Sequence, residues 1–357
     1  MKLGIVTLYG DFNYGNRLQN YALHTTLSDM GHDVTSLVTI QKASPIKKVY
    51  RKYFEKECGK IRPKSQKELR RDALFSRFTA CYIPTRFIES AQGLPRELND
   101  EFDAFVVGSD QVWNPLWWGE ALECCCSNDF LLRFVDNDKR VAYSASFGLN
   151  SVPDAWKALF GDEIGRFRAV SVREEAGASI VAKLTGNRPP VTLDPTMLLD
   201  ADRWRRIESR VQPAEKYVFQ FNLGELSDEQ KTLANQLSDM GYQIVDYMNP
   251  KCSYFGGGPS EFLSLIDGAA CVLTDSFHAS VFSILFRRPF VVFERKHANG
   301  SNMNSRINTL LATFGLEHRR CLNDADAALS CDFVDVDGLM EAHRQLSLNY
   351  LNDALPR

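Results

Sequence analysis

Several features that would place a chain in a specific class are missing from this sequence. No stretch of its 357 residues approaches the ~20 consecutive apolar residues that a membrane-spanning helix requires. The opening segment MKLGIVTLYG is too short for the apolar core and cleavage site of a signal peptide, and it is typical of a first β-strand. A net charge of −3 disfavours a dedicated nucleic-acid-binding protein. We therefore expect a cytoplasmic protein, or one bound peripherally at the inner face of a membrane.

Paired cysteines are missing as well. The nine cysteines include no C-x-x-C pair. The run Cys124-Cys125-Cys126 has no matching His or Cys spacing, because three adjacent side chains cannot easily all face one tetrahedral metal. We expect reduced, structural thiols and no metal, which agrees with a cytoplasmic location.

What the sequence does contain is an alternation of strand-like and helix-like segments. A strand at 3–8, a helix at 18–30 and a strand beginning at 33–37 form a βαβ opening, which implies a parallel sheet. Further strands are predicted at 104–107, 140–144, 169–172, 216–221, 242–245, 271–273 and 290–293. Further helices are predicted at 228–240, 260–268, 279–286 and 305–314. The pattern predicts an α/β protein with two Rossmann-like domains and a cleft between them.

The domain boundary is expected near residues 185–200, where Gly186-Asn187-Arg188-Pro189-Pro190 interrupts the pattern. We assign residues 1–190 to an N-terminal domain on the acceptor side and residues 191–335 to a C-terminal domain on the donor side. Residues 336–357 are expected to form a helix that packs back on the first domain.

A basic segment interrupts the first domain. Residues 41–80 contain thirteen Lys or Arg against four acids, a net charge of +9 that leaves −12 for the rest of the chain. We predict a basic helical insert over residues 41–100. It is either a solvated helical excursion or, through residues 41–80, a patch that contacts an anionic membrane or a polyanionic acceptor.

Polar side chains follow the ends of two predicted strands of the first domain. Asn13, Asn16 and Gln19 follow the first strand without the G-x-G-x-x-G pattern of a dinucleotide site, and suit the hydroxyls of a sugar. Helix capping by Asn13 or Asn16 is the alternative. Ser109, Gln111 and Trp113, with Asp110, follow the strand at 104–107. An aromatic ring beside polar groups is typical of a carbohydrate site, although a buried Trp is common too.

Three helices begin with residues that suit an anion. Ser276 and His278 lie in the turn between the strand at 271–273 and the helix that follows it. The N-terminus of that helix favours a phosphate or carboxylate. Arg173 and Arg306 each begin a helix, where a cation opposes the helix dipole and needs a partner. For Arg173 that partner is either Glu174 or Glu175, or a bound anion shared with Ser276, His278, Ser305 and Arg306.

Six segments share an order with the motifs of one known family: Phe12–Leu23, Val107–Asn114, Ser171–Glu174, Leu193–Thr196, Thr274–Ala279 and Asn304–Ile307. Together they resemble the polysaccharide pyruvyl transferase family. The resemblance implies a GT-B-like fold and transfer of a pyruvyl group from phosphoenolpyruvate, a co-substrate, to a sugar diol. The acceptor would be a cell-surface polysaccharide or its lipid-linked precursor, and the products a pyruvate ketal and phosphate. No cofactor and no metal are expected.

The resemblance also implies roles for residues. Relatives hold phosphoenolpyruvate with an Arg that matches Arg173 and with an Arg-x-His motif whose His matches His278. Ser276 stands where that motif has its Arg, so Arg306 or Arg288 is expected to supply the missing cation. The full donor set is Arg173, Ser276, His278, Ser305 and Arg306.

The reaction needs an acid for C3 of the enol ether, a base for the sugar hydroxyls, and cations for the phosphate and carboxylate. Asp110 is the predicted acid or base, with Asp275 and Asp11 as rivals. His278 serves either as a phosphate ligand, which its position favours, or as the acid. The predicted acceptor set is Asn13, Asn16, Gln19, Ser109, Gln111 and Trp113.

Two other functions remain open from the sequence. A GT-B glycosyltransferase that uses a nucleotide sugar would need a carboxylate for the ribose, and Glu294 is a candidate, but a Gly-rich pyrophosphate loop is missing. A non-catalytic saccharide-binding protein would explain the serine at position 276.

Overall fold

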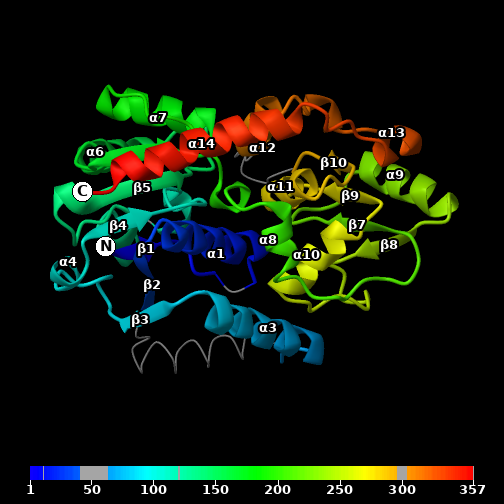
Figure 1. Ribbon diagram of the computed structural model, residues 1–357, viewed down its shortest axis with the longest axis horizontal. Helices are drawn as coiled ribbons and strands as arrows, with labels where there is room; N and C mark the ends of the chain where they lie inside the picture. Colours follow the sequence, from blue (N-terminus) through cyan, green and yellow to red (C-terminus); the bar gives the residue numbers. More distant parts are fainter. Residues whose placement is uncertain (11, 41–62, 120, 296–303, 357) are drawn as a thin grey trace.

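The computed structural model describes residues 1–10, 12–40, 63–119, 121–295 and 304–356 of the chain. Within these ranges, two parallel β-sheets with flanking helices lie side by side (Figure 1). The prediction of two Rossmann-like units in a GT-B-like arrangement is therefore confirmed.

The first sheet has six parallel strands in the order β3-β2-β1-β4-β5-β6. Its strands are β1 (Lys2–Val6), β2 (Asp33–Ile40), β3 (Thr85–Glu89), β4 (Ala104–Val107), β5 (Arg140–Ala145) and β6 (Ala169–Val172). Its longer helices are α1 (Tyr14–Asp29), α3 (Gln66–Tyr82), α6 (Asp154–Ile164) and α7 (Glu175–Thr185). The central strand β4, with the sequence AFVV, is buried at every residue, as a parallel strand covered on both faces should be.

The second sheet has four parallel strands in the order β10-β9-β7-β8. Its strands are β7 (Tyr217–Phe221), β8 (Gln243–Asp246), β9 (Cys271–Thr274) and β10 (Phe290–Val292). Its helices are α9 (Asp228–Asp239), α10 (Pro259–Asp267), α11 (Phe277–Leu285), α12 (Ser305–Thr313) and α13 (Ala325–Leu329). Between the sheets the chain forms a short 3₁₀ turn, η3 (Pro195–Met197), and α8 (Ala201–Arg205).

The last helix, α14 (Val336–Ala354), returns to the first sheet, so that both termini lie on the same side of the molecule (Figure 1). The Tyr350 hydroxyl donates to the carbonyl oxygen of Ala142 in β5 at 2.8 Å. The Arg168 guanidinium donates to the carbonyl oxygen of Ala354 at 3.0 Å. These bonds tie the end of the chain to the first sheet.

The predicted basic helical insert at 41–100 contains a strand as well as a helix among its described residues. Residues 85–89 form β3, which pairs in parallel with β2 and adds an edge strand to the sheet. Helix α3 is present, capped by Ser65 and Glu68. It reaches the second domain, where the Lys67 ammonium donates to the carbonyl oxygens of Pro250 at 3.1 Å and Cys252 at 2.8 Å.

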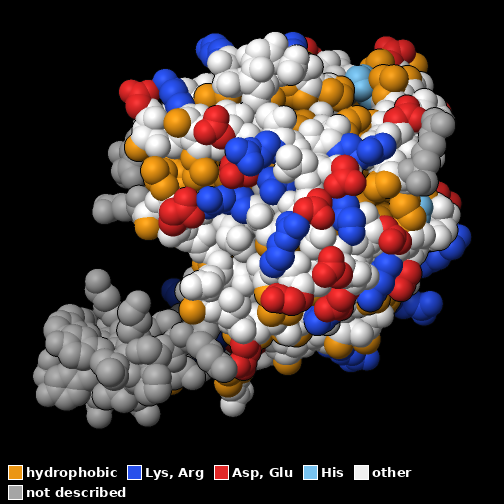
Figure 2. All heavy atoms as spheres, turned by 90° about the vertical axis from the view of Figure 1, so that its left-hand side faces the viewer, with side chains coloured by type: hydrophobic (Ala, Val, Ile, Leu, Met, Phe, Trp, Pro, Cys, Tyr) orange, Lys and Arg blue, Asp and Glu red, His pale blue; other side chains and the backbone are white. Residues whose placement is uncertain are grey.

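The predicted membrane patch lies mostly at residues 41–62, outside the described residues. Among its described cations, Lys64 pairs with Asp72 and Lys67 bonds to the second domain, so these charges have partners within the protein. The face of the first domain in Figure 2 carries basic and acidic side chains interspersed. No helix in the described part of the chain is both long and apolar enough to cross a membrane.

Candidate functional site

A pocket of 280 Å³ lies between the two sheets, and we call it the cationic pocket because two arginines line it. Its lining residues are Phe12, Asn13, Tyr14, Gly15, Asp110, Gln111, Trp117, Phe221, Leu223, Phe262, Ser276, Phe277, His278, Arg295 and Arg306.

The topology explains its place. Strand order reverses between β1 and β4 in the first sheet, and between β7 and β9 in the second. At such points the loops that leave neighbouring strands diverge and open a crevice at the carboxyl edge of the sheet. The loops after all four of these strands contribute to the cationic pocket. The two crevices therefore form one site.

Three helix N-termini end at this pocket. Asn13 caps α1, and its side-chain oxygen accepts from the backbone N–H of Asn16 at 3.0 Å. Ser276 caps α11 by accepting from the N–H of Ala279 at 3.5 Å. Arg306 lies in the first turn of α12. Since each N-terminus carries a partial positive charge, their convergence favours an anion.

Arg306 is the cation with the least compensation in the pocket. Among the described residues, its nearest carboxylate oxygen is Oδ1 of Asp110, 3.9 Å away. Burial, followed by the charge of Arg173, lowers the pKa of Arg306 to about 10. The side-chain amide of Gln111 lies 2.9 and 3.0 Å from the two terminal nitrogens of Arg306. It accepts hydrogen bonds from them when its oxygen, and not its nitrogen, is turned toward the guanidinium. The Nε of Arg306 is buried without a hydrogen-bond partner among the described residues.

Arg295 is the second cation of the pocket and was not predicted. Its Nε donates to Oδ2 of Asp275 at 3.0 Å, and a terminal nitrogen donates to the Asp275 carbonyl oxygen at 3.1 Å. Asp275 also accepts from the backbone N–H groups of Leu223 and Gly224, both at 2.8 Å. Because its carboxylate is occupied in this way, Asp275 serves to hold Arg295, and the structure gives no support to it as a proton donor.

Arg173 does not line the cationic pocket, contrary to expectation. Its terminal nitrogens donate to Asp194 at 2.7 Å and to Asp110 at 3.1 Å, and its side chain is 1% exposed. Its predicted partners Glu174 and Glu175 are engaged elsewhere, Glu174 with Ser146 and Glu175 with Arg188. Two buried carboxylates therefore hold the guanidinium behind the pocket wall.

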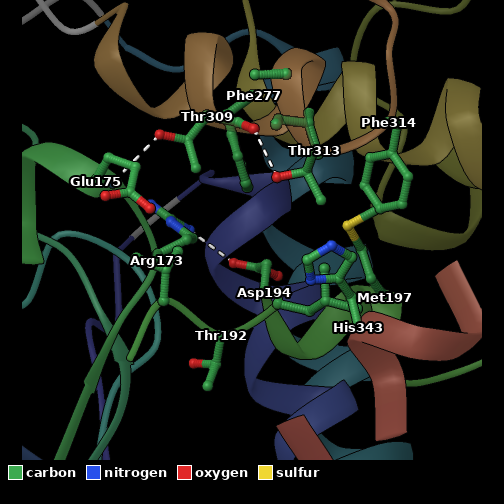
Figure 3. A pocket seen from close by; sticks show the side chains of 14 residues that line it. Arg173, Glu175, Thr192, Asp194, Met197, Phe277, Thr309, Thr313, Phe314 and His343 are labelled. Carbon is green, nitrogen blue, oxygen red and sulfur yellow. Dashed lines mark hydrogen bonds and ion pairs between the residues drawn. The ribbon is translucent and has the colours of Figure 1, made fainter. Parts of the chain in front are cut away.

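A second cavity, of 430 Å³, lies between α7, α12 and α14, and we call it the rear cavity. Figure 3 shows the side chains that line it, among them Arg173 and Asp194. Thr309, Thr313 and His343 contribute to its lining. The Arg173–Asp194 ion pair thus forms part of the wall of the rear cavity.

The two carboxylates are ionised. Burial alone would raise the pKa of Asp110, but Arg173, His278 and Arg306 more than offset burial and hold that pKa below its ordinary value. Burial would likewise raise the pKa of Asp194, but His278, Arg173 and Thr196 hold it far below its usual range. Asp110 lines the pocket, and its ionised carboxylate suits a base or an electrostatic partner. The prediction of Asp110 as an acid is not supported.

His278 lies at the junction of the two domains. Its Nε2 is buried 3.6 Å from Oδ2 of Asp194 and has no hydrogen-bond partner among the described residues. The other side of the ring packs on α1, where a Cβ added to Gly15 would lie 1.9 Å from Nδ1. Only glycine leaves room for the imidazole here. The ring therefore depends on both domains for its position.

Several predicted acceptor residues lie inside the first domain instead. Trp113 is 0% exposed, and its indole N–H donates to the carbonyl oxygen of Phe130, so its ring offers no face to a sugar. Gln19 and Ser109 are also 0% exposed. The Gln19 amide accepts from the Ser109 N–H at 2.9 Å and donates to the Thr7 hydroxyl at 2.8 Å. These three side chains are structural.

The structure brings Asn13, Gln111, Ser276, His278 and Arg306 together in the cationic pocket. Ser305 and Arg288 lie outside its lining. The Ser305 hydroxyl is buried without a partner among the described residues. Arg288 lies beyond the opposite end of α11 and bonds to Asp267 at 3.3 Å, so it cannot supply the missing cation. Asp11 lies outside the described residues.

Sequence reasoning missed Trp117, Tyr14 and Arg295 as lining residues, and it gave Asp194 no role. Asp194 was visible only as part of a motif, since its charged partner Arg173 is 21 residues away and its partner Ser109 is 85 residues away. Trp117 lies next to Trp118, which is buried, and no local signal distinguished the two. The eight cysteines described are free thiols, and no group of three His, Cys, Asp or Glu among the described residues is arranged to hold a metal.

Comparisons with known proteins add to this geometry. The model of the family "Polysaccharide pyruvyl transferase" matches residues 13–297. No curated protein matches the chain.

Solved structures that the chain resembles include UDP-GlcNAc 2-epimerases from Neisseria meningitidis and from Methanocaldococcus jannaschii. The first is 10% identical, with a TM-score of 0.48, and 99% of each chain is covered. The second is 12% identical, with a TM-score of 0.44, and 92% of this chain and 98% of that chain are covered. ADP-heptose LPS heptosyltransferase II from E. coli is 13% identical, with a TM-score of 0.37 over 99% and 98% of the chains. Identities this low carry no information about the ligand.

Proposed function

Since the chain belongs to the polysaccharide pyruvyl transferase family, we propose that it transfers the pyruvyl group of phosphoenolpyruvate to two hydroxyls of a saccharide. The products are a cyclic ketal and phosphate. The observation that carries this proposal is the cationic pocket, where three helix N-termini converge and no described carboxylate lies closer than 3.9 Å to the buried Arg306.

The donor has two anionic groups, and the pocket has two arginines. Arg306 and Arg295 both line it beside Ser276, which occupies the place of the family's arginine. Arg295 is anchored by Asp275, so its guanidinium has a defined position. In this proposal the two arginines together replace the cation that Ser276 lacks. Arg173 acts behind them, by fixing Asp110.

His278 is the proposed acid that protonates C3 of the donor. Histidine is the side chain most often used as a general acid, and His278 lines the pocket. Its Nε2 lies 3.6 Å from Asp194 and has no hydrogen-bond partner among the described residues. A sugar hydroxyl then adds to C2 and gives its proton to a base, for which the ionised Asp110 is the candidate. The C2–O bond to phosphate breaks, the second hydroxyl closes the ketal, and its proton leaves with the phosphate.

A thermal-shift experiment tests the donor. Phosphoenolpyruvate at about 100 times its dissociation constant should add about 2.7 kcal/mol to the free energy of unfolding, and phosphate alone should add less. Stabilisation no greater than that given by phosphate would contradict the proposal. Stabilisation by UDP or UDP-sugars instead would indicate a glycosyltransferase. The structure gives that alternative little support, because Glu294, the candidate carboxylate for a ribose, pairs with Arg320.

Two arginine variants test whether phosphoenolpyruvate binds in the cationic pocket. Arg306→Gln and Arg295→Gln should each weaken phosphoenolpyruvate binding by about 10- to 100-fold, since a hydrogen bond to a charged group contributes about 1.5–3 kcal/mol. The matched control is Arg86→Gln, an exposed arginine of β3 that pairs with Glu101. It should bind the donor as the native protein does. Equal affinity in all three variants would place the donor elsewhere.

A further inference from the structure

A larger hollow of 640 Å³ opens beside the cationic pocket, at the carboxyl ends of β1 and β2. We call it the aromatic pocket; it is lined by Thr7–Gly10, Asn13, Asn16, 37–40, Phe87, Trp117, Cys125, Cys126, Asp129 and Phe130. No Lys, Arg or His is among these lining residues. Among the described residues, the lining of the aromatic pocket therefore holds no cation that would compensate a phosphate or carboxylate, whereas its neighbour has two arginines.

Aromatic rings form much of its wall, and two of them are unusually exposed. Trp117 is 51% exposed and Phe87 is 48% exposed. The Phe87 ring is supported edge-on by Tyr9, with centroids 5.4 Å apart. Trp117 ends a 3₁₀ turn, η1 (Pro115–Trp117), that is capped by the Asn114 side chain. Rigid aromatic faces of this kind pack on the C–H surfaces of sugar rings.

The polar groups of the pocket suit hydroxyls. The Nδ2 group of Asn16 is buried and has no hydrogen-bond partner among the described residues, and the Asn16 residue is 1% exposed. Its Oδ1 already accepts from the backbone N–H of Gly10 at 3.4 Å. What remains is a fixed amide donor that a ligand oxygen would satisfy. On the opposite wall, the Thr39 hydroxyl donates to Asp129 at 2.6 Å, which leaves a hydroxyl oxygen as an acceptor.

The two pockets are joined. Asn13 and Trp117 line both of them, so a ligand in one comes close to a ligand in the other. Asn13 caps α1 and is exposed, and Trp117 ends the η1 turn that follows β4. A group bound in the aromatic pocket can thus extend toward Asp110 and His278.

We propose that the aromatic pocket binds one uncharged hexopyranose unit of the acceptor, packed on Trp117 and hydrogen-bonded by the Nδ2 group of Asn16. The assignment of this sugar as the acceptor rests on the proposed function. The described lining holds one carboxylate, Asp129, and no cation, which favours an uncharged sugar ring over an anionic one. The reacting diol of that sugar points past Trp117 into the cationic pocket.

Fluorescence quenching tests this directly. The other four tryptophans are 0–7% exposed, so acrylamide quenching reports mainly on Trp117. The probes are the methyl pyranosides of glucose, galactose, mannose and N-acetylglucosamine, with glucuronic acid as the charged comparison. At least one neutral glycoside should protect Trp117 from acrylamide at a lower concentration than glucuronic acid does. No protection by any neutral glycoside would overturn the proposal.

Two variants and one control sharpen the test. Asn16→Asp keeps the acceptor for Gly10 and removes the amide donor, and it should weaken glycoside binding by tenfold or more. Trp117→Ala should weaken it as much, measured by isothermal titration. The control is Leu116→Ala, which should bind glycosides as the native protein does. Leu116 is next to Trp117, is 57% exposed and lines neither pocket. Equal binding by all three would also overturn the proposal.

The outcomes separate this inference from the proposed function. If phosphoenolpyruvate stabilises the protein but no glycoside protects Trp117, the sugar site is wrong and the donor assignment stands. If glycosides protect Trp117 but phosphoenolpyruvate does not bind, the pocket holds sugar and pyruvyl transfer is wrong.

Discussion

Asp110, Arg173, Asp194 and His278 form a buried network that the pocket rests on. Arg173 bridges the two carboxylates, and Asp194 also accepts from the Thr196 hydroxyl at 2.7 Å. Burying charges in this way is costly unless each has a partner, and here the partners come from both sides of the domain boundary. The network therefore fixes the geometry of the site.

The pH dependence of stability should report on these carboxylates. Their pKa values are lower in the folded protein than the ordinary value of about 4, so the folded state binds fewer protons. Their contribution is fully present above about pH 4 and is lost as the pH falls through the lowered values. The free energy of unfolding, measured in urea, should therefore decrease from about pH 4 downward.

Asp110→Asn should remove part of that dependence. It should also lower stability at pH 7 by on the order of 3 kcal/mol, because Arg173 loses one of its two buried partners. Asp154→Asn, which alters an exposed pair with Lys157, should change little. An acid limb that is identical in the native protein and in Asp110→Asn would argue against ionised Asp110.

At the scale of elements, the site depends on how helix ends meet. The first turn of α1, from the first domain, contacts the first turn of α11, from the second, where Gly15 meets His278. Neither helix alone holds the imidazole in place. A small residue at position 15 is thus a requirement of docking between helices.

Gly15→Ala should separate helix stability from site geometry. Alanine is a better helix former than glycine, but its Cβ would collide with the His278 ring. We expect retained helix content by circular dichroism and a loss of phosphoenolpyruvate affinity of at least tenfold. Gly338→Ala in α14, where nothing lies within 4 Å, should instead stabilise by about 0.5–1 kcal/mol and leave binding unchanged. Normal donor binding by Gly15→Ala would contradict this packing.

At the scale of the whole molecule, the two sheets share a hydrophobic core. One cluster of buried residues includes Leu3 and Leu18 of the first domain and Phe219 and Phe262 of the second. Tyr14 inserts between the domains, stacked on Phe262 with centroids 4.9 Å apart, and its hydroxyl donates to the Gly257 carbonyl oxygen at 2.9 Å. Burial raises the pKa of Tyr14 to about 12. The domains are therefore coupled by packing.

This shared core predicts cooperative unfolding. Scanning calorimetry should show one transition, with a calorimetric enthalpy close to the van't Hoff enthalpy, because each sheet loses part of its core when the other unfolds. Two resolved transitions would show that the domains unfold independently. Phosphoenolpyruvate should move the single transition as a whole, since its proposed site is built from both domains.

The sequence by itself determined the strands, their parallel arrangement and the polar loops at their carboxyl ends. Runs such as AFVV at 104–107 are buried on both faces, so local hydrophobicity was sufficient to find them. Strand β3 was not predicted, because it is a half-exposed edge strand. It pairs through its backbone, and its side chains show little of the hydrophobic pattern of a buried strand. Asn13, Ser276 and His278 were found because helix starts have local signatures.

Only the tertiary structure decided which polar groups face the pocket and which pair with one another inside the protein. Arg173 could not be paired from the sequence, because its carboxylates lie 63 and 21 residues away. Trp113 and Trp117 are four residues apart, yet one is 0% and the other 51% exposed, since only the packing of the first domain separates them. Contact across a domain boundary depends on how whole surfaces dock, and no local pattern in the sequence encodes it.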